Sequence, residues 1–119
     1  MERVEIIHMP MIHGNYIPCK HKQNVIVWFN DMYNKNEELF ENSKLFNLKC
    51  SDTTQNSDNV EIKMTFDNNE KLEDDDIESL IENMDCPYSE IYSEYFIVID
   101  NICGNLSIGN ILSINKYRL

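Results

Sequence analysis

Alanine is absent from this chain of 119 residues, and glycine and proline occur only three times each. With so few glycines a phosphate-cradling loop is not expected, and the GxGxxG, P-loop, HExxH and GxSxG motifs are all missing. Acidic residues are so abundant that the mere presence of carboxylate pairs carries no information about catalysis. We therefore predict that the protein is not an enzyme and uses no cofactor.

Long apolar runs are also missing. No stretch approaches the roughly 20 apolar residues that a membrane span requires. The N-terminal sequence MERVEIIHMPMIHG is charged early and lacks the uninterrupted apolar segment of a signal peptide. We therefore expect a cytoplasmic protein that does not bind membranes.

Close cysteine pairs are absent, since Cys19, Cys50, Cys86 and Cys103 are all far apart in the chain. In the expected compartment these residues are reduced thiols, and their usual role is that of small, partly buried apolar side chains. A zinc site formed by Cys19 and His21 with a distant cysteine stays open as an alternative. The spacing, however, matches none of the compact zinc patterns.

Positive charge is scarce, because 10 lysines and arginines stand against 21 acids and leave a net charge of −11. Residues 67–94 hold eleven of the acids and a single base, Lys71, so the remainder of the chain is close to neutral. A segment of this kind repels nucleic-acid phosphates and anionic lipids, and it attracts basic proteins. We expect a basic protein partner and no direct nucleic-acid binding.

Apolar periodicity predicts four strands besides the ambiguous run 24–29, and the connections between them. The clearest strand is 60–66, where Val60, Ile62, Met64 and Phe66 alternate with polar residues. The other predicted segments are strands at 2–9, 94–102 and 106–115, loops at 10–23 and 51–59, and a turn at 103–105.

The short apolar run 24–29, NVIVWF, is ambiguous. Its β-branched and aromatic residues favour a buried strand, which is our prediction. A helix is the rival, because Val25, Trp28, Phe29 and Met32 also fit helical spacing. A helix is predicted directly afterwards, at 34–47, with acids in its first turn.

The segment KLEDDDIESLIENMD, residues 71–85, predicts an amphipathic helix. Ile77, Leu80, Ile81 and Met84 follow the i, i+3, i+4, i+7 spacing of one apolar stripe. Asp75 and Glu78 resemble a capping box, with Asp75 as N-cap. The order of elements predicts one α+β domain over 1–119, with an antiparallel sheet of about four to five strands and two helices packed on one side.

The acids of this helix are the candidate binding site, together with two tyrosines that follow it, because tyrosine is enriched at interface hot spots. The predicted partner-binding residues are Asp74, Asp75, Asp76, Glu78, Glu82, Asp85, Tyr88 and Tyr92. A simple solvated helix face is the alternative. A specific calcium site is not expected, because the oxygen-rich stretch DNNEKLEDDD lacks the glycine of an EF-hand loop.

These features favour a small acidic inhibitor or immunity-type protein that blocks a basic partner, either a nuclease toxin or a nucleic-acid-handling factor. In size, acidity and expected fold class the chain resembles toxin-immunity proteins as a group, although no motif connects it with one family. Its 16 asparagines and 15 isoleucines are typical of AT-rich coding sequences, so a viral or phage antagonist is one form of this hypothesis. The alternative is a structural or assembly subunit of a larger complex, a viral one included, with an apolar interface.

Overall fold

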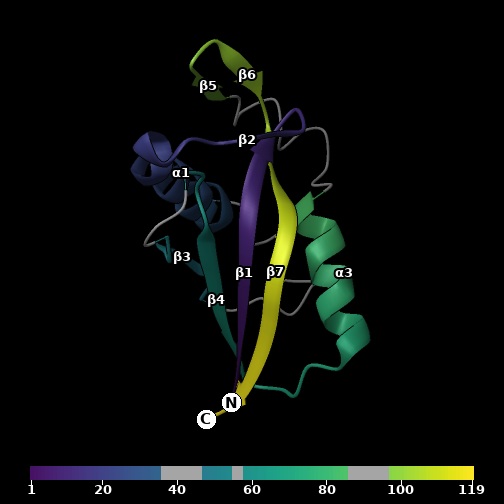
Figure 1. Cartoon of the computed structure of the whole chain (residues 1–119). Helices are drawn as coiled ribbons and strands as arrows, with labels where there is room; N and C mark the ends of the chain where they lie inside the picture. Colours follow the sequence, from purple (N-terminus) through teal and green to yellow (C-terminus); the bar gives the residue numbers. More distant parts are fainter. Residues whose placement is uncertain (36–46, 55–57, 86–96) are drawn as a thin grey trace.

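The computed structural model describes residues 1–35, 47–54, 58–85 and 97–119 (Figure 1). In chain order its elements are β1 (Glu2–Ile12), β2 (Asn15–Tyr16), the 3-10 helix η1 (Cys19–His21), α1 (Lys22–Lys35), β3 (Lys49–Asp52), β4 (Ile62–Asn68), α3 (Asp74–Asp85), β5 (Ile97–Ile99), β6 (Ile102–Gly104) and β7 (Leu106–Arg118). Neither described helix is long and apolar enough to cross a membrane.

A five-stranded antiparallel sheet is the centre of the fold, and β1 is its central strand (Figure 1). One side of β1 pairs with β4, and the other side pairs with β7 along almost its whole length. The short strand β2 returns from β1 as a hairpin, and β3 pairs with β4. Strands β5 and β6 form a separate hairpin. The α+β class and the antiparallel sheet predicted from the sequence are confirmed.

Both helices cover the same face of the sheet. The even-numbered residues of β1 from Glu2 to Ile12 are buried, whereas the odd-numbered ones are half-buried. On this inner face the ring of His8 meets the ring of Phe29 from α1 edge-on, with centroids 5.7 Å apart. Lys116 of β7 pairs in register with Val4, so it lies on the same face, and its ammonium group reaches Asp74 of α3. One contiguous apolar core therefore lies between the sheet and the two helices.

Two register irregularities bend β7 against β1. The register of pairing shifts between Ile7 and His8, which leaves Leu112 as an extra residue of β7. It shifts a second time between Met9 and Met11, the two neighbours of Pro10. Pro10 has no backbone N–H to donate, so an irregular position in the ladder accommodates it at little cost. Gly109, opposite this point, has φ +65°, and a Cβ there would stand 2.0 Å from the carbonyl oxygen of Met9.

The outer edge of β3 is covered by α1. The side chain of Asn30 accepts a hydrogen bond from the backbone N–H of Cys50 at 2.7 Å and donates one to its carbonyl oxygen at 3.1 Å. A side chain that satisfies both groups of an edge residue takes the place of a neighbouring strand. This edge of the sheet is therefore capped within the chain.

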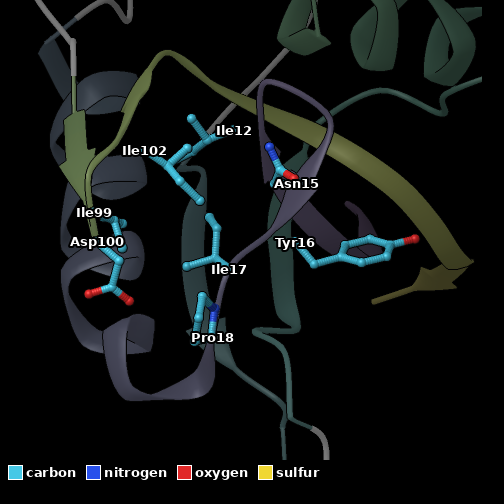
Figure 2. A pocket seen from close by; sticks show the side chains of 8 residues that line it. All are labelled: Ile12, Asn15, Tyr16, Ile17, Pro18, Ile99, Asp100 and Ile102. Atoms are coloured by element: carbon cyan, nitrogen blue, oxygen red, sulfur yellow. The ribbon is translucent and has the colours of Figure 1, made fainter.

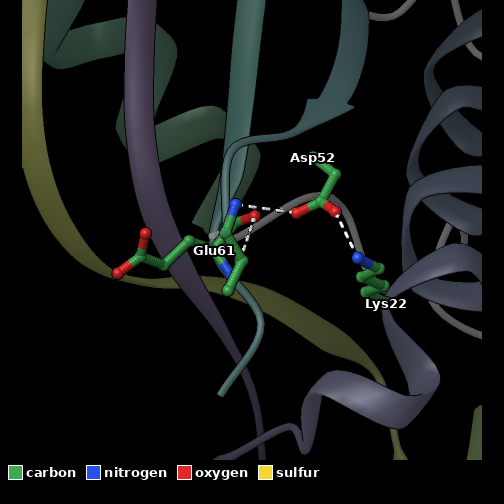
Figure 3. Close-up of polar contacts among 4 residues, drawn as sticks. Lys22, Asp52 and Glu61 are labelled. Atoms are coloured by element: carbon green, nitrogen blue, oxygen red, sulfur yellow. Dashed lines mark hydrogen bonds and ion pairs between the residues drawn. The ribbon is translucent and has the colours of Figure 1, made fainter. Parts of the chain in front are cut away.

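Polar contacts also join the start of α1 to the ends of β3 and β4 (Figure 3). Lys22 Nζ lies 2.8 Å from Asp52 Oδ2, and this contact lowers the pKa of the Asp52 carboxyl. Asp52 also accepts a hydrogen bond from the N–H of Thr54, whose hydroxyl accepts one from the N–H of Glu61. The contacts fix the first turn of α1 against the sheet.

The strand predicted at 24–29 is wrong, because α1 runs through this run as a helix. Val25, Phe29 and Met32 point inward at helical spacing, while Val27 is 57% exposed. A six-residue apolar run fits both periodicities, and burial against a sheet on one side only selects the helix.

Other boundaries also differ from the predictions. Strand β1 continues to Ile12, and α1 begins at Lys22, so 10–23 is not one loop. Strand β3 includes Ser51 and Asp52 of the predicted loop 51–59. The helix predicted at 34–47 falls mostly outside the described residues.

The region predicted as a strand at 94–102 contains a tight hairpin instead. Asp100 and Asn101 both have positive φ, 48° and 65°, and they form the turn between β5 and β6. Asp and Asn tolerate this conformation better than other residues with a Cβ. The turn predicted at 103–105 is therefore displaced by a few residues toward the N-terminus, and the predicted strands at 2–9, 60–66 and 106–115 are confirmed.

Candidate functional site

The helix predicted at 71–85 is present as α3 and carries the candidate site on its outer surface. Its apolar stripe is buried: Leu80 is fully buried, and Ile77 and Met84 are almost so. Ile81 packs against the core at the margin of the stripe. Burial of one stripe leaves the opposite side of α3 in solvent, and the acids occupy that side.

The N-terminus of α3 is capped two residues earlier than the sequence suggested. The N–H of Glu73 donates a hydrogen bond to Asp76 Oδ2 at 3.0 Å, and the carbonyl oxygen of Glu73 accepts one from Ile77 at 3.2 Å. Glu73 is therefore the N-cap, with Asp76 in the role of the third helical residue of a capping box. The prediction that Asp75 is the N-cap, paired with Glu78, is wrong.

Asp74 forms an ion pair that joins α3 to β7. Its Oδ1 atom lies 2.7 Å from Nζ of Lys116, and this contact lowers the pKa of the Asp74 carboxyl. The Asp74 side chain stays 86% exposed, so the pair remains in contact with solvent. It places the first turn of α3 beside the C-terminal end of β7.

Three predicted residues, Asp75, Glu78 and Glu82, are exposed on α3. Within the described part of the chain, no ion pair involves any of them. Asp74, Glu78 and Glu82 are spaced four residues apart, so they follow one side of the helix, and the first of them, Asp74, reaches Lys116. Acids at this spacing repel one another in the free protein, and a cationic partner would relieve that repulsion.

The remaining predicted residues are located only in part. Asp85 ends α3, but its side chain is outside the described part of the structure. Tyr88 and Tyr92 also lie outside it. Asp76 is half-buried in its capping role, so of the eight predicted residues the structure brings Asp74, Asp75, Glu78 and Glu82 together on one exposed surface, which we call the acidic surface.

A second exposed feature lies next to the acidic surface. In Figure 1, α3 runs beside β7, on the side of β7 away from β1, and in the opposite direction to it. The C-terminal half of β7 carries exposed apolar side chains: Leu112 is 50% exposed, Ile114 is 41% exposed and Tyr117 is 47% exposed. The sequence predicted this strand, but not that it would be the last strand of the sheet in the described structure.

A small pocket lies at the other end of the sheet, between the β1–β2 and β5–β6 hairpins (Figure 2). It has a volume of about 180 Å³, and its walls are mostly apolar, including Ile17 and Ile102. Asp100 stands at its margin, where its carboxylate binds His21 Nε2 at 2.9 Å and Lys20 Nζ at 3.1 Å. These contacts lower the pKa of Asp100 and satisfy the only acid in the pocket lining.

The thiols give no sign of metal or nucleophilic chemistry in the described structure. Cys50 is buried, which raises the pKa of its thiol to about 12, far from the thiolate form that reacts. His21, a candidate zinc ligand with Cys19, uses its Nε2 on Asp100. Among the described residues, no three His, Cys, Asp or Glu side chains gather as a metal site would require.

Comparison of the chain with protein-family models, with curated proteins and with solved structures finds no match. The acidic surface and the exposed side chains of β7 are the features of the described structure that indicate a function.

Proposed function

We propose that this protein is an inhibitor that binds a basic protein through the acidic surface of α3 and thereby blocks the partner's own contacts with an anionic ligand. A nuclease toxin or a nucleic-acid-handling factor has the required chemistry, because such proteins bind phosphate chains with basic surfaces. An acidic helix competes for the same lysines and arginines.

The supporting observation is a group of exposed acids with no ion pair in the described part of the chain. Lys116 forms an ion pair with Asp74. Asp75, Glu78 and Glu82 are exposed, and none of them forms an ion pair among the described residues. A single-sign surface of this kind accelerates the encounter with a basic protein, and the effect weakens as salt screens the charges. The core-facing side of α3 explains only its docking on the sheet; it does not require the acids.

Two variants with equal change in net charge test the proposal. The first carries Asp75→Lys, Glu78→Lys and Glu82→Lys on the acidic surface. The matched control reverses Glu5, Asp31 and Asp58, which lie outside α3. Both variants and the wild type are immobilised, exposed to extract from the native source at low salt, and eluted with rising salt for identification by mass spectrometry.

We expect the wild type and the control to retain the same basic protein and the acidic-surface variant to lose it, with association slowed about tenfold or more. The wild type should also inhibit the nucleic-acid binding or cleavage of the captured protein. Equal loss by both variants would show that bulk charge alone attracts the protein. Retention by all three would show that the acidic surface is not the binding site.

The exposed apolar residues of β7 support a second candidate, an assembly subunit of a larger complex. A sheet edge that pairs with no other described strand, with Leu112, Ile114 and Tyr117 exposed, is suited to pairing with another chain. Assembly through this edge predicts complexes that survive high salt, whereas an inhibitor held by charge dissociates there. Sedimentation velocity of the complex from the native source at low and high salt separates the two.

A further inference from the structure

The outer edge of β7 offers unpaired backbone groups within the described structure. The N–H of Leu119 donates to the carbonyl oxygen of Met1 at 2.9 Å, so it points toward β1. Backbone N–H groups alternate sides along a strand, so those of Tyr117 and Asn115 also point toward β1. By the same alternation, Ile114, Lys116 and Arg118 direct their N–H and C=O groups outward.

The two edges of the sheet differ in whether other described residues bond to their backbone groups. On the β3 edge, Asn30 of α1 satisfies both backbone groups of Cys50. On the β7 edge, no described strand or side chain fills the same role opposite Ile114, and Asn110 to Leu112 and Ile114 to Leu119 are all exposed. Natural sheets usually protect an edge of this length, unless it serves as a docking site.

The acidic surface runs parallel to this edge at a matching spacing. The ion pair between Asp74 and Lys116 aligns the first turn of α3 with the C-terminal end of β7, and the two elements run in opposite directions (Figure 1). Glu78 and Glu82 follow at about 6 and 12 Å along the helix axis. Strand residues advance about 3.3 Å each, so these two acids are level with Ile114 and Leu112.

We propose that the outer edge of β7 accepts an extended segment of the partner as an additional antiparallel strand. Two basic residues of that segment, one opposite Ile114 and the other two positions further along, beside the register irregularity at Leu112, would face Glu78 and Glu82. Alternate residues of a strand lie about 6.7 Å apart on one face, close to the rise of about 6 Å between acids four residues apart on a helix. The inference rests on the proposed function and specifies its binding mode.

Charge determines both the register and the identity of this strand. A basic residue directly opposite Lys116 would be repelled, so the basic pair belongs opposite Ile114 and beside Leu112. The methylene stems of those lysines would cover the exposed side chains of Ile114 and Leu112. A second copy of the chain is disfavoured, because antiparallel pairing of two β7 strands would bring two acidic surfaces together on the same side of the joined sheet.

Four synthetic peptides test the proposal without altering the protein. The probe is acetyl-TVKVKVT-amide, whose two lysines share one face of a strand. Its isomer, acetyl-TVKKVVT-amide, has the same composition and charge but places the lysines on opposite faces. The other two are versions of the probe N-methylated at both lysines or at the two outer valines. Binding to the full chain is measured by isothermal titration calorimetry at low salt, and the oligomeric state by sedimentation.

We expect the probe to bind about tenfold or more tightly than its isomer. Because Ile114 directs its N–H and C=O outward, the residues opposite it use their own N–H groups toward β7, so N-methylation of the lysines removes binding while N-methylation of the valines leaves it within about twofold. The Glu78→Gln and Glu82→Gln variant should lose the preference for the probe over its isomer.

Equal binding of probe and isomer, or equal tolerance of both N-methylated forms, would overturn strand addition and leave the proposed function intact. Absence of peptide binding, in a protein that still retains its basic partner, would have the same meaning. A dimer that strengthens with salt and excludes the probe would show that a second copy occupies the edge.

Discussion

The Nδ1–H group of His8 donates a hydrogen bond to the carbonyl oxygen of Ile108 at 2.8 Å inside the core. His8 is fully buried, and its Nε2 atom has no hydrogen-bond partner in the described structure. Burial therefore lowers the pKa of His8 to about 4, and the Ile108 carbonyl opposes this shift only in part. The imidazole is neutral at physiological pH, with its proton on Nδ1.

Acid should consequently destabilise the fold through His8. Between about pH 6.5 and 4 the unfolded chain binds a proton at this residue and the folded chain does not, so the free energy of unfolding falls as the pH falls. The expected loss is about 2 kcal/mol near pH 5. Urea unfolding at neutral pH and near pH 5 measures it.

His8→Leu should be less stable at neutral pH but lose less stability on acidification than the wild type. His13→Asn is the control, because it also removes one histidine but at an exposed position in the β1–β2 turn. An identical pH dependence for His8→Leu and the wild type would assign the acid sensitivity to other groups.

Gly109→Ala should destabilise the protein far more than Gly14→Ala. Both glycines have positive φ, 65° and 75°, so alanine introduces backbone strain of about 1–2 kcal/mol at either position. At Gly14 the added Cβ meets nothing within 4 Å, whereas at Gly109 it would stand 2.0 Å from the Met9 carbonyl oxygen. We expect a total loss on the order of 3 kcal/mol or more for Gly109→Ala by thermal or urea unfolding. Equal effects would mean that β7 does not cross β1 so closely.

A comparison of Asp76→Ala with Asp75→Ala distinguishes the stability that the N-terminal cap of α3 contributes from the stability that negative charge in the first turn contributes. Each variant removes one acid near the positive end of the helix dipole, but Asp76 alone accepts the hydrogen bond from Glu73 N–H. Asp76→Ala should therefore cost about 1 kcal/mol more in unfolding free energy than Asp75→Ala. Equal costs would place the N-cap elsewhere, and a larger cost for Asp75→Ala would restore the cap expected from the sequence.

Asn30→Ala should uncover the β3 edge. Its two hydrogen bonds to Cys50 are lost together, and we expect the unfolding free energy to fall by about 1–3 kcal/mol. Asn34→Ala, one turn further along α1 at an exposed position, controls for the higher helix propensity of alanine. Hydrogen exchange of the Cys50 amide should quicken in Asn30→Ala and not in Asn34→Ala.

The sequence was sufficient wherever a long, regular pattern left one solution. The alternation of Ile62, Met64 and Phe66 predicted β4, and the stripe of Ile77, Leu80 and Met84 predicted α3, because each pattern buries one face in only one regular structure. The run 24–29 is too short for its periodicity to distinguish a strand from a helix, and its inward side chains contact residues distant in the chain, such as His8 against Phe29. Similarly, the position of the N-cap depends on where the chain turns into α3. Residues 73–76 are all acids, so the sequence alone did not distinguish Glu73 from Asp75 as the N-cap.

The sequence by itself determined that negative charge is concentrated in one segment and that this segment includes an amphipathic helix. Only the tertiary structure decided that the helix lies along β7, that Lys116 pairs with Asp74 while Glu78 and Glu82 are exposed, and that no described strand pairs with the outer edge of β7 while Asn30 covers the other edge. Charge and periodicity are local properties of a sequence, whereas strand order and the neighbours of an edge follow from how distant segments pack around one core.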